Sequence, residues 1–158
     1  MLCYIDCMLL DCQIVPQTII KPKSFAGLMA MYESNFLRLL YLIPELEQLD
    51  GCFRSRVAGA CDLHVAILER CRYTITLSMT YLFASEDGDI ADPDITVRAY
   101  LDGRLAESLS LYDHQRHGEL QKMQRDNRPE LRARWQRNVV LNKWLEYLTD
   151  QGHLILDR

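Results

Sequence analysis

The chain has 158 residues, of which 49% are hydrophobic and 25% are charged. This composition is typical of one globular domain and excludes disordered, collagen-like and coiled-coil proteins. Its 18 Lys and Arg residues against 22 Asp and Glu residues give a net charge of −4. That balance argues against a protein that coats nucleic acid with its whole surface, but it still allows a local basic patch.

The cysteine spacing and the apolar stretches indicate the compartment. The six cysteines follow neither a zinc pattern nor a disulfide framework. Every apolar stretch is interrupted by charge well before the roughly 20 residues that span a bilayer. The apolar start of the chain carries Asp6 and Asp11 and lacks the pattern of a signal peptide. We therefore expect a cytoplasmic protein with reduced thiols and no membrane partner.

The first expected element is a helix. Residues 1–22 match neither helix nor strand periodicity, and we interpret them as an N-terminal extension to a single domain over residues 23–158. From Ser24, a plausible N-cap, apolar residues recur at three- and four-residue steps until Pro44 ends the run. This spacing predicts an amphipathic helix.

After this helix the apolar period changes to two, which is typical of strands with one buried face. The expected strands run from Phe53 to Val57, Leu63 to Ile67, Tyr73 to Phe83, Ile95 to Leu101 and Arg104 to Leu111. A long second helix is predicted to begin near Pro129 and to end at Gly152. The order predicts an α+β fold, an antiparallel meander of about five strands with both helices packed on one face.

One hairpin can be placed in register from its turn. Asp102-Gly103 lies between two alternating segments, which is a strong hairpin signal. A two-residue turn there puts Arg98 directly opposite Glu107, an opposite-charge pair, and places Ala99 beside Ala106. Small side chains at the last two positions would let a helix approach the sheet closely.

Several separate segments carry a resemblance to a known family. They are Ser24 to Met29, Asn35, Phe36 and Pro44, then Arg72 to Thr74, Thr96 to Tyr100, Ala106 and Glu107, and finally Asn138 to Leu141, Trp144, Leu145, Tyr147 and Gly152. From about Ser24 to His153 the chain resembles the YqiB-like family of bacterial proteins. The resemblance implies a cytoplasmic domain of unknown function and supplies no mechanism. Where that family often has Asp-Ala in its hairpin, this chain has Asp102-Gly103, which makes a tight turn easier.

An acidic stretch is the best candidate for a metal site. Between Glu86 and Asp94 lie five carboxylates, enough oxygen ligands for Mg²⁺ or Ca²⁺ if the stretch curled around an ion. It lacks the glycine and glutamate positions of an EF-hand, and we favour a solvated loop between strands. The histidines show no zinc pattern. We expect neither a metal nor a cofactor.

Sequence motifs for covalent or nucleotide chemistry are missing. The chain has no Gly-x-Ser-x-Gly elbow, no dinucleotide fingerprint and no phosphate-binding glycine loop. Cys71, between Arg70 and Arg72, comes nearest to an activated thiol, and we interpret it as a turn residue. The interpretation therefore leans away from an enzyme.

Basic residues concentrate between positions 114 and 137, where seven basic residues outnumber three acidic ones. The guanidinium group suits bidentate binding of phosphate. The arginines assigned to a possible phosphate or RNA site are Arg116, Arg125, Arg128, Arg132 and Arg134. We favour the alternative, a solvated polar face with internal ion pairs.

The remaining candidate site residues are predicted to lie on the sheet and on the last helix. Arg98, Tyr100 and Glu107 are expected on the open sheet face, as part of a partner site or as an ordinary ion pair beside other strand residues. Asn138 and Asn142 lie one turn apart among apolar residues. Each is predicted to bond to a sheet edge or the preceding loop, with a ligand-positioning amide as the alternative.

The leading functional hypothesis is a non-catalytic cytoplasmic domain that binds a partner protein or a second copy of itself, with a regulatory role. The alternative is a phosphate-ligand or RNA-binding protein that uses the basic segment. A small nucleotide-related enzyme is the weakest hypothesis, and it would depend on Arg98, Tyr100, Glu107 and Asn138.

Overall fold

The computed structural model describes residues 24–112 and 130–156, and the predicted N-terminal extension lies outside these ranges. The two described helices are α2 (Phe25–Leu42) and α4 (Glu130–Asp150), and the strands are β1 (Cys52–Ser55), β2 (Leu63–Arg70), β3 (Thr74–Phe83), β4 (Ile90–Tyr100) and β5 (Leu105–Tyr112).

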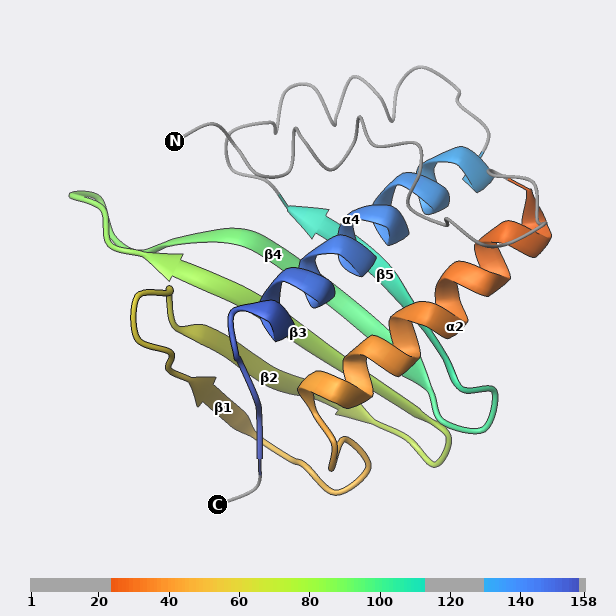
Figure 1. Ribbon diagram of the computed structural model, residues 1–158, viewed down its shortest axis with the longest axis horizontal. Coiled ribbons are helices and arrows are strands. Elements are labelled where there is room, and N and C mark those ends of the chain that lie inside the picture. The colour runs from red at the N-terminus through yellow and green to blue at the C-terminus, as the bar shows by residue number, and fades with distance from the viewer. Residues whose placement is uncertain (1–23, 113–129, 157–158) are drawn as a thin grey trace.

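The five strands form one sheet in the order β1-β2-β3-β4-β5, and every pairing is antiparallel. Both helices lie against the same face of this sheet (Figure 1). The expected α+β meander is confirmed. Neither described helix combines the length and the apolarity that crossing a membrane requires.

Helix α2 begins and ends where the sequence predicts. The Ser24 hydroxyl accepts a hydrogen bond from the Gly27 amide at 3.0 Å, which satisfies one of the free amides of the first turn. At the other end, the Ile43 amide donates to the Leu39 carbonyl at 2.8 Å, and Pro44 follows.

Helix α4 ends at a glycine in the left-handed region. Gly152 has φ +89°, a conformation that side chains disfavour, and the His153 amide donates to the Leu148 carbonyl at 3.0 Å. The predicted stop is therefore confirmed. Its geometry turns the chain back toward the sheet, so that the following residues pack there. The predicted start at Pro129 lies just outside the described ranges.

The core lies between the helix pair and the sheet. Leu39 from α2, Leu77 and Met79 from β3, and Leu141 and Leu145 from α4 are all fully buried. Burial of each such side chain contributes on the order of 2 kcal/mol to folding. The alternating residues of β3 are Thr74, Thr76, Ser78 and Thr80, and they face the opposite side of the sheet.

The β4–β5 hairpin has a longer turn than the sequence predicts. The last paired residues are Tyr100 and Leu105, so four residues form the connection. Arg104 carries the positive φ, at +52°, whereas Gly103 does not. The Asp102 carboxylate accepts a hydrogen bond from the Gly103 amide at 2.8 Å, which stabilises the turn locally.

The acidic stretch is only partly a loop. Strand β4 begins at Ile90, so Asp92 and Asp94 lie within the strand rather than in a connection. Ile90 and its neighbour extend the pairing to the end of β3, where Ile90 faces Phe83. The apolar residues inside the acidic stretch explain this difference, because they continue the strand.

Candidate functional site on the edge strand β5

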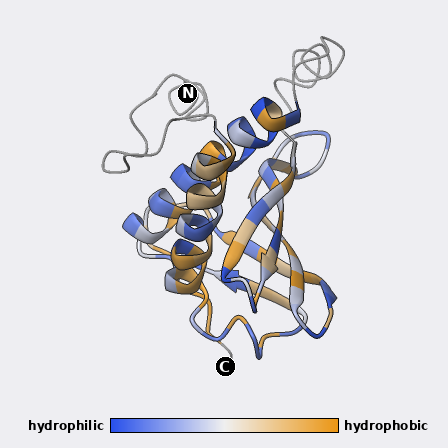
Figure 2. Cartoon of the chain, turned by 90° about the vertical axis from the view of Figure 1, so that its right-hand side faces the viewer, coloured by the Kyte–Doolittle hydropathy of each residue, from blue (hydrophilic) through white to orange (hydrophobic). Residues whose placement is uncertain are grey.

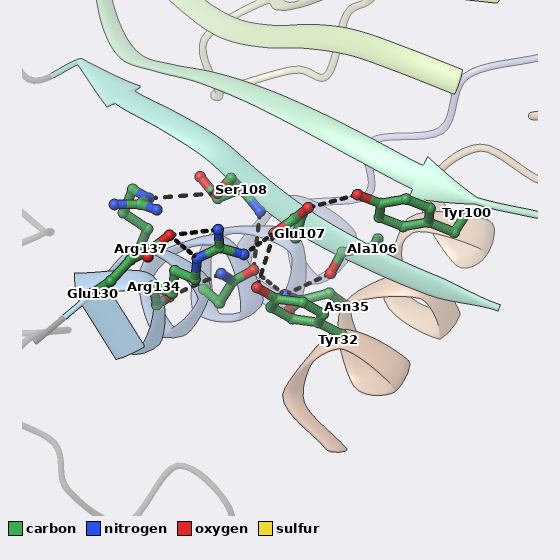
Figure 3. Close-up of polar contacts among 10 residues, drawn as sticks. Tyr32, Asn35, Tyr100, Ala106, Glu107, Ser108, Glu130, Arg134 and Arg137 are labelled. Atoms are coloured by element: carbon green, nitrogen blue, oxygen red, sulfur yellow. Dashed lines mark hydrogen bonds and ion pairs between the residues drawn. The ribbon is translucent and has the colours of Figure 1, made fainter. Parts of the chain in front are cut away.

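A polar cluster centred on Glu107 of β5 contains four of the predicted site residues, which are Tyr100, Glu107, Arg134 and Asn138 (Figure 3). Glu107 faces Arg98 of β4, so the register derived from the hairpin is confirmed. One carboxylate oxygen accepts a hydrogen bond from the Tyr100 hydroxyl at 2.7 Å. The other accepts from the Tyr32 hydroxyl of α2 at 2.8 Å. The carboxylate of this edge strand is therefore held between the sheet and a helix, and Glu107 is only 9% exposed.

Among the described residues, Arg134 of α4 brings a positive charge close to this carboxylate. Its guanidinium nitrogen lies 3.7 Å from Glu107 Oε2, while two other nitrogens bond to Glu130 Oε1 at 2.9 and 2.6 Å. The hydrogen bond to Glu130 raises the pKa of Arg134. The charges therefore alternate from helix to sheet, and the cluster connects the first turns of α4 to β5.

The two tyrosines remain protonated donors at neutral pH. Burial, followed by the hydrogen bond to Glu107, raises the pKa of Tyr32 to about 12. The same two causes raise the pKa of Tyr100. Both oxygens of the Glu107 carboxylate accept hydrogen bonds from hydroxyl groups, so its position is fixed from the sheet and from α2.

Arg98 does not bond to Glu107, although the two residues face each other. Its Nε donates to the Thr76 hydroxyl at 3.2 Å, and its terminal nitrogen lies 3.7 Å from Glu69. The ion pair between Arg98 and Glu107 that the sequence predicts is therefore wrong. The guanidinium group of Arg98 is directed instead toward Thr76 of β3 and Glu69 of β2.

Side chains from both helices bond to the outer edge of β5. The Ser108 amide donates to Asn138 Oδ1 at 2.9 Å, and Asn35 Nδ2 donates to the Ala106 carbonyl at 3.3 Å. The two asparagines also bond to each other at 3.1 Å, and Arg137 Nε donates to the Ser108 carbonyl at 3.5 Å. The prediction that Asn138 bonds to a sheet edge is confirmed.

Asn142 bonds to the neighbouring helix instead of a sheet edge or loop. Its Nδ2 donates to Asn35 Oδ1 and to the Ser34 hydroxyl, both at 2.9 Å. This residue lies one helical turn beyond Asn138, where α4 faces α2. Asn35 and Asn138 are fully buried, and Asn142 is nearly so. Their amides serve the fold, which leaves the ligand-positioning alternative without support in the contacts.

The predicted basic site is only partly described. Arg116, Arg125 and Arg128 lie outside the described residues. Arg132 is exposed on α4, and Arg134 is engaged by Glu130 and Glu107. Within residues 24–112 and 130–156, no three His, Cys, Asp or Glu side chains gather into a group that could hold a metal ion.

Two members of the cluster, Tyr32 and Asn35, were not identified from the sequence. Both lie on the apolar face of α2, beside Phe36 and Leu39. A polar side chain on the buried face of a helix must find a partner. That position was the signal that could have identified Asn35.

A five-stranded antiparallel meander, flanked by two helices that close its last edge with buried amides, defines this chain as a single-sheet α+β protein. The chain belongs to the family DUF1249, described as a protein of unknown function, whose family model matches residues 38–154. The resemblance implied a domain of unknown function, and the match confirms that much. A search of curated proteins found no match to the chain, and neither did a search of solved structures.

Proposed function

We propose that this chain is a non-catalytic cytoplasmic domain that binds a partner protein through the open face of its sheet. The observation that carries this proposal is the location of the helices. Both pack on one face, and the opposite face of the five strands carries neither of them (Figure 2). The three cysteines within the described ranges are free, which agrees with a reducing compartment.

The open face has the mixed chemistry of a reversible protein interface. At its centre, the half-exposed Ser78 lies between Ala66 of β2 and Thr96 of β4. Leu82, at the end of β3, is 37% exposed, and Arg98 contributes a partly exposed charge. Interfaces of this kind combine apolar contact with polar groups, about as apolar overall as ordinary surface.

The contacts of the polar cluster support a binding role over a catalytic one. The Glu107 carboxylate is bonded at both oxygens, and Asn138 bonds to the backbone of β5. These were the first candidates for chemistry, and the fold uses the groups that a reaction would require.

The test introduces a long, charged side chain at the centre of the open face. Native mass spectrometry of the wild-type protein from its own host first identifies a retained protein. Ser78→Arg should then weaken that complex by about ten-fold or more, because an interface centre tolerates an unpaired charge poorly. Gln136→Arg is the matched control, since it adds the same side chain at a half-exposed position of α4.

Two results would contradict the proposal. One is a wild-type protein that is a bare monomer without a co-purifying protein. The other is an affinity for the partner that Ser78→Arg leaves unchanged. Retained RNA or phosphate, lost steeply as salt rises, would instead favour the alternative site around Arg132.

A further inference from the structure

The segment that follows α4 is attached to the domain by alternate residues. His153 and Ile155 are buried, at 3% and 2% exposure, whereas Leu154 and Leu156 are 47% and 38% exposed. The Ile155 amide donates to the carbonyl of Leu42, the last residue of α2, at 2.9 Å. The segment therefore lies in an extended conformation against the fold and shows two leucines to solvent.

The imidazole of His153 forms the other attachment. Its Nε2 lies 3.0 Å from the Tyr81 hydroxyl of β3, and its Nδ1 lies 3.0 Å from the Ser55 hydroxyl of β1. The Leu154 amide also donates to the Ser55 hydroxyl at 3.3 Å. One side chain thus connects the C-terminal segment to two strands of the sheet.

This arrangement suits a neutral imidazole only. A neutral ring has one nitrogen that donates and one that accepts, so either Tyr81 or Ser55 donates its hydroxyl hydrogen to the ring. When both nitrogens carry protons, both must donate, and that hydroxyl hydrogen loses its acceptor. Because Ser55, Tyr81 and His153 are all buried, the lost hydrogen bond is not replaced by water.

Burial affects the pKa of the His153 imidazole more strongly than the charged and titratable groups around the ring do. Burial lowers the pKa of His153, and the negative charge of Asp62, just before β2, opposes that shift more weakly. Burial also raises the pKa of Tyr81, with smaller contributions from Tyr147 of α4 and Cys61. Tyr81 therefore stays neutral, and the charge of Asp62 offsets only part of the effect that burial has on the imidazole.

We propose that His153 is an acid-sensitive latch, whose protonation releases residues 153–156 from the sheet and from α2. Release would uncover the Ser55 and Tyr81 hydroxyls and the Leu42 carbonyl on the helix side of the sheet. The sign follows from linkage, since the released form binds the proton more tightly than the closed form. The latch is closed above the ordinary pKa of 6.5 and opens progressively as the pH falls below it.

Hydrogen exchange read by NMR on the full chain tests the latch. After correction for the intrinsic effect of pH, exchange of the Ile155 amide should rise by about ten-fold or more between about pH 7.5 and about pH 5. The Leu77 amide, in the centre of β3, should remain protected, which separates local release from global unfolding.

Two variants isolate the imidazole. His153→Gln cannot titrate, so the exchange of Ile155 should no longer depend on pH, whatever its absolute rate. His64→Gln removes a half-exposed histidine on β2 and should respond to pH as the wild type does. Equal protection of Ile155 at both pH values in the wild type, or the same pH response in His153→Gln, would overturn the proposal.

A second measurement decides the question if His153→Gln fails to fold. The imidazole Cε1 proton of His153 is followed by NMR in the wild-type protein as the pH is lowered. The latch requires a midpoint below 6.5, together with a parallel rise in Ile155 exchange. A midpoint at or above that value would exclude it.

Discussion

The two edge strands of the sheet, β5 and β1, differ in what bonds to their outward-facing backbone groups. At β5 the outward-facing backbone of Ala106 and Ser108 bonds to Asn35, Asn138 and Arg137, which the two helices supply. At β1, a strand of only four residues, no such cover exists among the described residues apart from the contacts of Ser55 with the C-terminal segment. One edge is built into the core, and the other faces solvent.

The difference shows how a helix pair can replace a neighbouring strand. A carboxamide carries the same kinds of group as a peptide, a carbonyl oxygen that accepts and N–H groups that donate. Asn138 accepts from the Ser108 amide, and Asn35 donates to the Ala106 carbonyl, as the backbone of a sixth strand would. An apolar helix face at this position would bury unpaired backbone groups, at a cost of about 1 to 3 kcal/mol each. The amides thus permit close packing over the small residues of β5.

The largest loss of stability is expected when Asn138, which takes the place of a neighbouring strand, is truncated. Asn138→Ala should lower the free energy of unfolding by about 3 kcal/mol, because the Ser108 amide and Asn35 both lose their acceptor in a buried site. Urea denaturation measures the loss. The control, Gln136→Ala on the same helix, should change stability by about 0.5 kcal/mol or less.

A second variant at position 138 separates the two roles of the Asn138 amide, as a hydrogen-bond acceptor and as a donor. Asn138→Asp keeps an acceptor for Ser108 and loses the donor that bonds to the Arg134 carbonyl at 2.8 Å. The substitution also buries a carboxylate. The free energy of unfolding of this variant therefore reports how far hydrogen bonds from Asn35 and Ser108 offset the cost of burying that charge. If Asn138→Ala costs less than about 1 kcal/mol, the edge is satisfied in some other way and the comparison of the two edges fails.

A smaller effect is expected at the tyrosine that bonds to Glu107. Tyr32→Phe removes one donor from the carboxylate and should cost about 1 kcal/mol at neutral pH. Since the folded pKa of Tyr32 is raised from 10.0 to about 12, the wild type should lose stability as the pH rises through this interval. The variant lacks that contribution, so its stability should fall less over the same range.

Urea denaturation at intervals between about pH 9 and about pH 11.5 measures this difference. Tyr73→Phe is the control, because Tyr73 is 50% exposed. It should follow the wild-type curve closely. A Tyr32→Phe curve parallel to that of the wild type would show that the Tyr32 hydroxyl ionises as freely in the fold as in the unfolded chain.

The register around this site could be predicted because it depends on local symmetry. Asp102-Gly103 was assigned a two-residue turn, whereas the connection has four residues and Arg104 adopts the left-handed conformation. Both turns are centred between the same two residues, so both place Arg98 opposite Glu107. Strand pairing can therefore be right when the turn is wrong.

The contacts of this cluster that involve helix α2 could not be predicted, because their partners come from segments far apart in the sequence. Tyr32 and Glu107 are 75 residues apart, and Asn35 and Asn138 are 103 apart. Periodicity shows which face of a helix is buried, but it does not show which strand that face meets. His153 illustrates the same limit, since its contacts depend on where Gly152 directs the chain.

The smallest effect is expected at the exposed edge. Arg54 bonds to Asp62, and Arg56 lies 3.5 Å from the same carboxylate. The pKa of Asp62 is lowered chiefly by its hydrogen bond to Arg54. Arg54→Ala should therefore raise this pKa, an effect that NMR titration of the carboxyl group measures, while the urea midpoint stays within error because exposed ion pairs contribute little.

Amide exchange at Arg54 of β1 and at Ser108 of β5 compares the two edges of the sheet directly. The Gly51 carbonyl accepts from the Ile67 amide, so by the alternation of an antiparallel pair the Arg54 backbone points away from β2. Its amide should exchange much faster than that of Ser108, which Asn138 protects. Slow exchange at Arg54 in the isolated protein would mean that something pairs with β1, and the two edges would then differ only in what covers them.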